Sequence, residues 1–287
     1  MERLLQRVKR MLMRVLVTGV IVYAALCLLI FLNQRKLLFP MPENVREPRL
    51  PGAALLRLPG PEGTQVYALH VPAAAGAPTV VHFHGNGEQL ADEAWLAQRY
   101  QEAGLGFYAV EYPGYGLAGG REPSETGLYA AAQLALEHLH GALGVAREHT
   151  VLQGQSLGSG VAVEMARRGQ GARLVLITPY TSMVDMGANL FPWLPVRLLA
   201  KDRFDSAAKA PGLGLPVLIV HGTRDEVIPV EMGRKLGGLF PQATVHLVEG
   251  KGHNTVLDTP ALLEELMRFA RGESPRGDWA GLREGPR

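Results

Sequence analysis

Residues 152–160 read L-Q-G-Q-S-L-G-S-G, and this stretch decides the fold. It places Ser156 between Gly154 and Gly158, directly after an apolar run at 150–153 and directly before a helical pattern at 157–168. Three interpretations compete: a flexible linker, a dinucleotide-binding loop, and a strand-to-helix turn that presents a nucleophile. A linker does not fit, because the stretch joins two predicted elements directly.

A dinucleotide-binding loop does not fit either. That loop needs G-x-G-x-x-G, and when the pattern is counted from Gly158 and Gly160 its third glycine position holds Val163. The remaining interpretation is G-x-S-x-G, a sharp turn whose glycines let the strand and the helix approach closely. The same five residues also fit a serine that merely lies in a glycine-rich turn. The prediction of a nucleophile therefore depends on partners elsewhere in the chain.

The rest of the chain alternates apolar runs with helical patterns. Strands are predicted at 66–71, 79–83, 106–111, 150–153, 173–178, 217–220 and 244–248, and helices at 87–103, 122–140, 157–168, 229–239 and 259–271. Such alternation is typical of an α/β protein with a mostly parallel sheet and helices on both faces.

One connection, residues 179–215, is far longer than the usual two to six residues of a strand-to-helix loop. It is apolar, with Met183, Met186, Leu190, Phe191, Trp193, Leu194, Leu198 and Leu199. We interpret residues 180–210 as a small lid. An ordinary helix and loop packed on the sheet is the alternative.

The first residues predict a membrane anchor. Residues 15–32 carry no charge, and as a helix they rise about 27 Å, close to the roughly 30 Å of bilayer hydrocarbon. We therefore divide the chain into a basic segment (1–14), a transmembrane anchor (15–32), a proline-rich connector (33–51), a globular domain (52–271) and a disordered tail (272–287). A cleaved signal peptide and a buried core helix are the alternatives for residues 15–32.

The distribution of basic residues suggests an orientation for this anchor. Five Lys or Arg residues precede the span and four follow it closely, which favours a cytoplasmic N-terminus. The globular domain is then expected on the non-cytoplasmic side, which is the periplasm in a bacterium. Outside residues 1–36 the chain has 22 basic and 26 acidic residues and no basic stripe, so we do not expect nucleic acid as a partner. Cys27 is the single cysteine, and an intrachain disulfide is impossible.

A serine nucleophile needs a base, and the base needs an orienting carboxylate. Asp225 follows the apolar run at 217–220. His253 follows the last predicted strand, in a loop that also contains Gly250, Gly252 and Asn254. The order serine, acid, histidine is the one that accompanies G-x-S-x-G in this type of fold. Asp185 is the alternative acid.

The stretch V-V-H-F-H-G-N-G at 80–87 provides a further element of the predicted site. His82 and His84 lie on one face of a strand, a spacing that is also typical of a metal site. No nearby third ligand or cysteine pair completes such a site. Attack on a carbonyl creates an oxyanion that needs preorganised N–H donors. We predict the backbone amides of Leu157 and Asn86 as those donors, and the predicted chemistry needs no cofactor.

Six motifs together resemble the α/β-hydrolase superfamily: H-G-N-G (84–87), E-Y-P-G-Y-G (111–116), P-S-E-T-G (123–127), G-Q-S-L-G (154–158), H-G-T-R-D (221–225) and G-K-G-H-N (250–254). N-Q-R-K-L-L-F-P at 33–40, after the apolar span, and F-P-W-L-P-V-R-L-L at 191–199 are similar to segments of its single-pass, membrane-anchored serine hydrolases. The resemblance implies an α/β-hydrolase fold with an eight-stranded, mostly parallel sheet and a small helical lid. It implies a triad of Ser156, Asp225 and His253, with Asn86 and Leu157 as the oxyanion hole. Gly87 and Glu88 depart from the more usual alanine and glycine after H-G-N.

The predicted function is hydrolysis of carboxylic esters or thioesters by an anchored enzyme that acts on a small or lipid-like acyl substrate. Members of the resembled family also include serine aminopeptidases, which bind the free amine of a substrate. A peptidase with the same triad is therefore an alternative, with Asp185, Asp202 and Asp205 as candidate amine ligands. A non-catalytic binding module with this fold is a second alternative.

Overall fold

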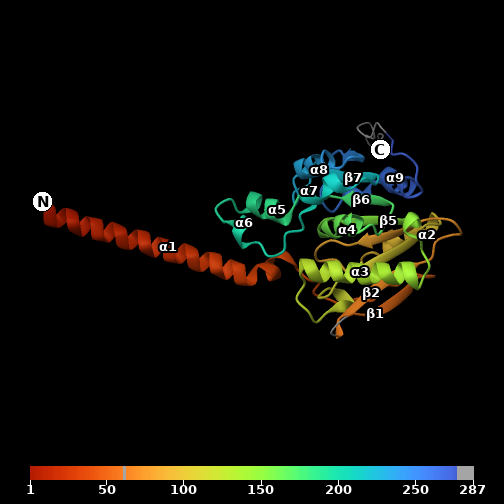
Figure 1. The fold of residues 1–287 in the computed structure, drawn as a ribbon, viewed down its shortest axis with the longest axis horizontal. Helices are drawn as coiled ribbons and strands as arrows, with labels where there is room; N and C mark the ends of the chain where they lie inside the picture. The colour runs from red at the N-terminus through yellow and green to blue at the C-terminus, as the bar shows by residue number, and fades with distance from the viewer. Residues whose placement is uncertain (61–62, 277–287) are drawn as a thin grey trace.

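The computed structural model describes residues 1–60 and 63–276, in which one long helix leads into an α/β domain (Figure 1). The eight strands are β1 (Ala54–Pro59), β2 (Gln65–Val71), β3 (Thr79–Phe83), β4 (Gly106–Glu111), β5 (Thr150–Gln155), β6 (Arg173–Ile177), β7 (Val217–Gly222) and β8 (Ala243–Val248). They form one open sheet in the order β1-β2-β4-β3-β5-β6-β7-β8. β2 pairs antiparallel with β1 and β4, and every other pairing is parallel. The predicted fold class is confirmed.

Helices cover both faces of this sheet because its strands are apolar on both faces. The larger ones are α2 (Ala94–Glu102), α3 (Glu125–Gly141), α4 (Leu157–Arg167), α8 (Val230–Gly237) and α9 (Pro260–Ala270). Neighbouring residues of one strand serve opposite faces: Val81 packs in the core with α3, α4 and α8, and Val80 packs in the core with α2 and α9. Short 3₁₀ helices lie at Gly116–Ala118, Arg147–His149, Ala210–Gly212 and Val256–Asp258.

Two elements differ from the sequence prediction. β1 was not predicted from the residue pattern, because at this sheet edge Leu58 is the one fully buried side chain of the strand. The helix predicted from residue 87 begins at Ala94, because Gly87 has a φ of +74° and the following residues form turns. The extra turns form the loop that joins β3 to α2 beside the candidate site.

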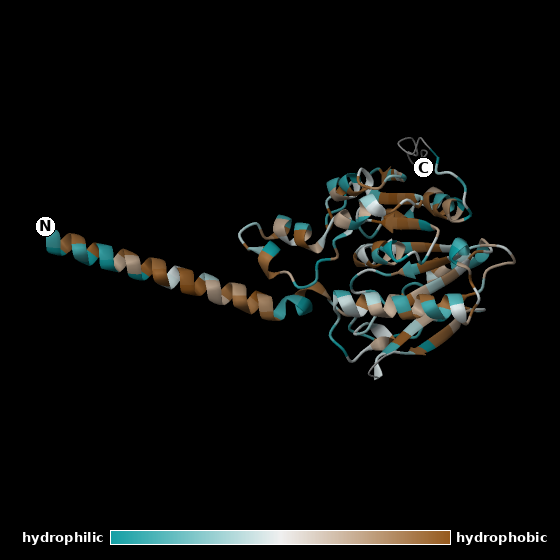
Figure 2. Cartoon of the chain, in the orientation of Figure 1, coloured by the Kyte–Doolittle hydropathy of each residue, from teal (hydrophilic) through white to brown (hydrophobic). Residues whose placement is uncertain are grey.

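The first helix, α1 (Glu2–Leu38), is long and apolar enough to cross a membrane. Figure 2 shows its apolar middle as a brown stretch between more polar ends. The helix extends through the predicted basic segment and into the first six residues of the predicted connector. Of the predicted tail, residues 277–287 lie outside the described part, while Arg276 contacts Glu265 of α9 with a 2.7 Å hydrogen bond from its amide.

The long connection after β6 contains three short helices, α5 (Met183–Leu190), α6 (Val196–Leu199) and α7 (Ser206–Lys209). α5 and α6 project from the domain toward α1 (Figure 1). Met183 and Met186 of α5 still pack against the domain core, and the lid stays a prediction.

Candidate active site

Ser156 occupies a strained turn between β5 and α4. Its φ and ψ are 48° and −117°, a region that costs a non-glycine residue about 1–3 kcal/mol. The flanking glycines make the turn possible. A Cβ on Gly154 would lie 2.3 Å from the Gly158 carbonyl oxygen, and a Cβ on Gly158 would lie 1.9 Å from that of Phe83. The turn leaves the serine side chain at the carboxyl ends of the parallel strands.

Asp225 and His253 form a hydrogen-bonded pair at the same edge of the sheet. Asp225 follows β7, His253 follows β8, and His253 Nδ1 lies 2.8 Å from Asp225 Oδ2. The carboxylate is fully buried, and its Oδ1 accepts the amides of Val227 at 2.9 Å and Ile228 at 2.7 Å. The Asp225 side chain is therefore held in one orientation toward the His253 ring.

A second histidine, His221, also contacts this carboxylate. Its Nε2 lies 3.1 Å from Asp225 Oδ2 and 2.9 Å from the Ile228 carbonyl oxygen. Burial alone raises the pKa of Asp225, but the hydrogen bonds from His221 and His253 and from the Ile228 amide outweigh it and hold that pKa well below its usual range. The Asp225 carboxylate is therefore ionised at neutral pH.

Ser156 and His253 lie at one edge without a direct hydrogen bond between them in the described part of the chain. Gln155, which precedes the serine, and His253 line the same cavity of about 210 Å³. Catalytic hydrogen bonds are often long in structures without substrate and tighten when it binds. A small rotation of the Ser156 or the His253 side chain changes the distance between the serine hydroxyl and the imidazole ring.

The loop after β3 lies against the serine. A Cβ on Gly85 would lie 3.5 Å from the Ser156 Cβ, in van der Waals contact. The backbone N–H groups of Asn86 and Leu157 donate to no acceptor among residues 1–60 and 63–276. Two unengaged amides beside a serine are suited to bind a negatively charged oxygen.

The side chain of Asn86 is fixed from two directions. Its Nδ2 donates to the Leu38 carbonyl oxygen at 2.7 Å, and its Oδ1 accepts from the Tyr115 hydroxyl at 2.6 Å. The next amide, of Gly87, donates to the Pro40 carbonyl oxygen at 3.1 Å. The C-terminal end of α1 and the residues just after it therefore hold this loop in position.

Glu88 also holds the loop, and sequence reasoning missed its role. Its carboxylate accepts the Gly85 amide and, at 3.1 Å, the Gln155 side-chain amide. Burial raises the pKa of Glu88. The signal in the sequence was the unusual Gly87–Glu88 pair after H-G-N, because a carboxylate here ties the loop to the end of β5.

The two histidines of the H-x-H pattern are buried and paired with separate carboxylates. His82 Nε2 lies 3.0 Å from Glu93, and His84 Nε2 lies 3.1 Å from Glu111. Burial lowers the pKa of His84, but the Glu111 carboxylate outweighs this effect and raises it to about 9. These pairings indicate a structural role for both rings, beneath the sheet edge that carries the candidate site.

The three carboxylates proposed for binding a substrate amine are engaged elsewhere. Asp202 is 2.8 Å from Arg35 Nε and also accepts the Glu125 amide, and Asp205 caps α7 by accepting the Ala208 amide. Asp185, which is also the alternative acid, accepts from the Thr181 hydroxyl at 2.9 Å. No contact in the described residues joins Asp185 to His253.

Comparisons with known proteins agree with this fold. A family model described as alpha/beta hydrolase fold matches residues 194–260. An uncharacterized protein of Mycobacterium tuberculosis is 35% identical over 206 residues, which cover 71% of this chain and 73% of that protein. The human alpha/beta hydrolase domain-containing protein 17C is 34% identical over 204 residues, 69% of this chain and 59% of that protein, so the match spans less than two thirds of its length.

Solved structures share the architecture at low sequence identity. The Pyrococcus furiosus esterase Pf2001 has a TM-score of 0.66 and 13% identity, with 81% of this chain and 99% of that chain covered. An esterase from Exiguobacterium antarcticum has a TM-score of 0.60 and 18% identity, with 75% and 98% covered. The sheet order, the family model and the relatives agree: the chain belongs to the α/β-hydrolase superfamily, and this membership supports a hydrolase activity.

Proposed function

We propose that the chain is a membrane-anchored serine hydrolase that cleaves carboxylic esters or thioesters through an acyl-enzyme on Ser156. The observation that carries the proposal is the Asp225–His253 pair at the sheet edge where the strained Ser156 turn ends. A serine held in a costly backbone conformation, at the same sheet edge as an oriented imidazole, is typical of an activated nucleophile.

In this mechanism His253 accepts the Ser156 proton as the hydroxyl oxygen attacks the acyl carbon. Asp225 orients the imidazole and stabilises the imidazolium that forms. The amides of Asn86 and Leu157 bind the oxyanion, and His253 returns the proton to the leaving group. Water then attacks the acyl carbon with His253 again acting as base, the bond from the acyl carbon to Ser156 Oγ breaks, and His253 returns the proton to that oxygen as the acid leaves.

The proposed substrate is an acyl compound of the membrane or its surface. This inference rests on the long apolar helix α1 and on the exposed apolar side chains of the lid, which include Leu190, Phe191 and Trp193. We place the domain on the non-cytoplasmic side from the distribution of basic residues. An aminopeptidase is less well supported, because Asp185, Asp202 and Asp205 already have protein partners.

A fluorophosphonate probe tests the serine mechanism directly. The wild-type chain should be labelled, and Ser156→Ala should lose labelling completely, because the probe needs an activated serine oxygen. Ser159→Ala is the matched control and should still be labelled. The Ser159 hydroxyl is buried and donates to the Ser156 carbonyl oxygen, so it is not the group that the probe reaches. A folded wild-type chain that resists the probe would favour the non-catalytic binding module.

Labelling of intact spheroplasts by a membrane-impermeant probe tests the orientation of the proposed anchor, and labelling only after lysis contradicts that orientation.

The tether on Asn86 gives a separate prediction. Asn86→Ala keeps the backbone N–H but removes the bonds to Leu38 and Tyr115, so the amide loses its alignment. Since losing one oxyanion donor costs about 10²–10³ in turnover, we expect kcat to fall by up to that factor with KM nearly unchanged. Tyr115→Phe removes one of the two tethers and should cost less. Unchanged kcat in Asn86→Ala contradicts the assignment of this amide to the oxyanion hole.

A further inference from the structure

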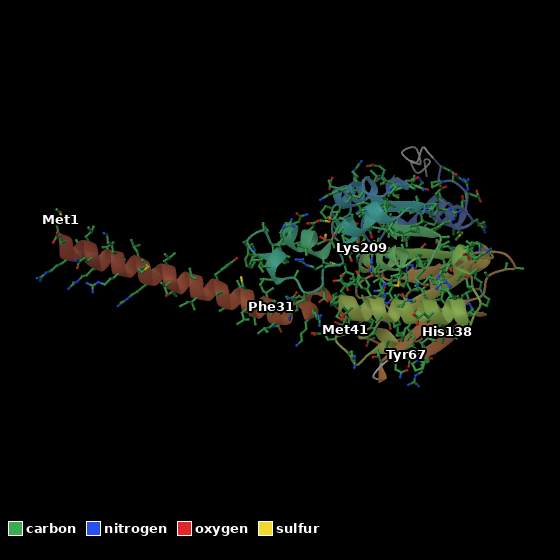
Figure 3. The ribbon with its side chains drawn as sticks, in the orientation of Figure 1. Met1, Phe31, Met41, Tyr67, His138 and Lys209 are labelled. Atoms are coloured by element: carbon green, nitrogen blue, oxygen red, sulfur yellow. The ribbon has the colours of Figure 1, made fainter. Side chains whose placement is uncertain are left out.

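The lid contacts the C-terminal part of α1, from Tyr23 to Arg35. The Tyr23 hydroxyl donates to the Trp193 carbonyl oxygen at 2.8 Å, and Gln34 Nε2 donates to the Leu199 carbonyl oxygen at 3.1 Å. Lys201 Nζ lies 4.2 Å from the centre of the Phe31 ring. Figure 3 shows Phe31 on the part of α1 that lies beside the lid helices.

The burial pattern of α1 agrees with this attachment. Six of its seven partly buried residues recur at the spacing of one helical face: Cys27, Ile30, Phe31, Gln34, Arg35 and Leu38. The seventh, Asn33, lies beside that face. The remaining faces of the apolar stretch are exposed. The lid therefore covers one stripe of the helix and leaves the rest available to lipid.

Tyr23 lies deep within the stretch that is proposed to span the bilayer. It is nine residues before Leu32, the last residue of the uncharged run, and nine residues of helix rise about 14 Å. Half of the hydrocarbon thickness is about 15 Å. With the helix upright, the level of Tyr23 and Trp193 is well inside the hydrocarbon, and tilt of the helix makes it shallower.

The spanning stretch cannot slide far enough to bring Tyr23 out of the bilayer. Such a shift would carry four basic side chains into the hydrocarbon, where charge is costly: Arg7, Lys9, Arg10 and Arg14. The position of Arg14 thus fixes one end of the span. A lid that contacts Tyr23 must then enter the bilayer with it.

Part of the lid surface is apolar. Four large apolar side chains of the lid are exposed in the described structure: Leu190, Phe191, Trp193 and, at 84%, Leu198. We call this set the lid tip. Phe191 and Trp193 pack edge to face, with ring centres 6.3 Å apart. In water such a cluster is unfavourable, whereas in a lipid leaflet each side chain is solvated.

Toward the domain, α1 makes charged contacts with the lid and with the residue Glu122 outside it. Nearer the domain, Arg35 pairs with Asp202 at 2.8 Å and lies 4.0 Å from Glu122, and the Lys201 amide donates to Gln34. Exposed apolar side chains of the lid at the far end and ion pairs at the near end match the order of hydrocarbon and headgroup layers.

We propose that the lid tip is embedded in the lipid leaflet on the domain side of the membrane, packed against α1. The inference rests on the proposed anchor and deepens the proposed function, because the lid leads from the leaflet to the sheet edge that carries Ser156. The acyl chain of a substrate then passes from the leaflet along the lid without crossing water.

Bromine quenching in vesicles tests the position of the lid. The full chain with Trp95→Phe and Trp279→Phe keeps Trp193 as its one tryptophan. After reconstitution in phosphatidylcholine vesicles, its emission should be blue-shifted and largely quenched when the acyl chains carry bromine. The matched control keeps Trp95 alone, through Trp193→Phe and Trp279→Phe. Trp95 is 46% exposed and Trp193 is 51% exposed, but Trp95 lies on α2 and should escape quenching. Equal quenching of both residues, or of neither, overturns the proposal.

A charged substitution in the lid tip links this position to substrate access. Leu198→Asp should lower hydrolysis of a vesicle-embedded long-chain ester by about tenfold or more, because a carboxylate opposes insertion. Labelling by a water-soluble fluorophosphonate should be unchanged. Leu55→Asp, on the exposed edge strand β1, is the control and should affect neither measurement. Unchanged vesicle hydrolysis in Leu198→Asp contradicts the access role.

The two proposals fail in different ways. Wild-type protein that takes the probe and cleaves esters, but whose Trp193 is not quenched, retains the proposed function and loses the embedded lid. Protein whose Trp193 is quenched, but that neither takes the probe nor cleaves any ester, retains the embedded lid and loses the proposed function.

Discussion

A His253→Ala variant should hydrolyse p-nitrophenyl butyrate about 10⁵- to 10⁶-fold more slowly than the wild-type chain, since removing the base of such a triad costs nearly as much as removing all of it. The physical reason is that a serine hydroxyl is a poor nucleophile at neutral pH unless a base accepts its proton. His253 is the histidine whose Nδ1 is held by the buried Asp225, which leaves its Nε2 for this task.

The fold should survive this substitution, because His253 lies in a loop after β8 and outside both apolar core clusters. Circular dichroism and the midpoint of thermal unfolding check this point. His149→Ala, at an exposed position on a short 3₁₀ helix, is the matched control and should keep wild-type activity. A His253→Ala variant with more than a few per cent of wild-type activity assigns the base elsewhere, and His221 is then the first candidate because it shares the Asp225 carboxylate.

The parts of the candidate site that could be predicted are those that short local sequence patterns specify. Gly154 and Gly158 identify a turn that other residues cannot form, and apolar strands followed by Asp225 and His253 identify side chains at one edge of a parallel sheet. Each pattern reports a backbone requirement of its own segment. Their combination predicted the pairing of Asp225 with His253, while a hydrogen bond from Ser156 to His253 stays a prediction.

The parts that were not predictable depend on contacts between distant segments. The Leu38 and Pro40 carbonyl groups hold the Asn86 loop, and any residue type supplies a carbonyl, so no sequence pattern marks them. Strand β1 is similar, because hydrogen bonds to β2 define it although most of its side chains are exposed. The position of the lid on α1 also rests partly on backbone carbonyl groups, at Trp193 and Leu199.

These contacts give the proposed anchor a second role. The last turn of α1 and the residues after it contact the loop that carries the proposed oxyanion donor Asn86. Phe39, directly after the helix, is 2% exposed and packs against Phe204, 6.2 Å between ring centres. The proposed membrane anchor and the candidate site are therefore connected through one short segment, Leu38–Pro40.

Asp225→Asn should lower kcat about 10⁴-fold while leaving the fold intact. The hydrogen bonds at this residue predict why an isosteric change is so costly. Oδ1 accepts two backbone amides, from Val227 and Ile228, so the asparagine oxygen must take this position and its NH₂ group must face His253. A donor opposite Nδ1 forces the His253 proton onto Nε2, and that nitrogen can no longer accept the Ser156 proton.

Measurement of kcat with p-nitrophenyl butyrate between pH 6 and 9 checks this prediction. In the wild-type chain the pKa of Asp225 is held well below its usual range, so protonation of this carboxylate does not limit activity above about pH 4. The loss in Asp225→Asn should therefore persist across the whole measured range. Asp185→Asn is the matched control, because it makes the same chemical change at the alternative acid. A large loss in Asp185→Asn together with a small one in Asp225→Asn would exchange their roles, since the orienting carboxylate is the one whose amide cannot support the required histidine tautomer.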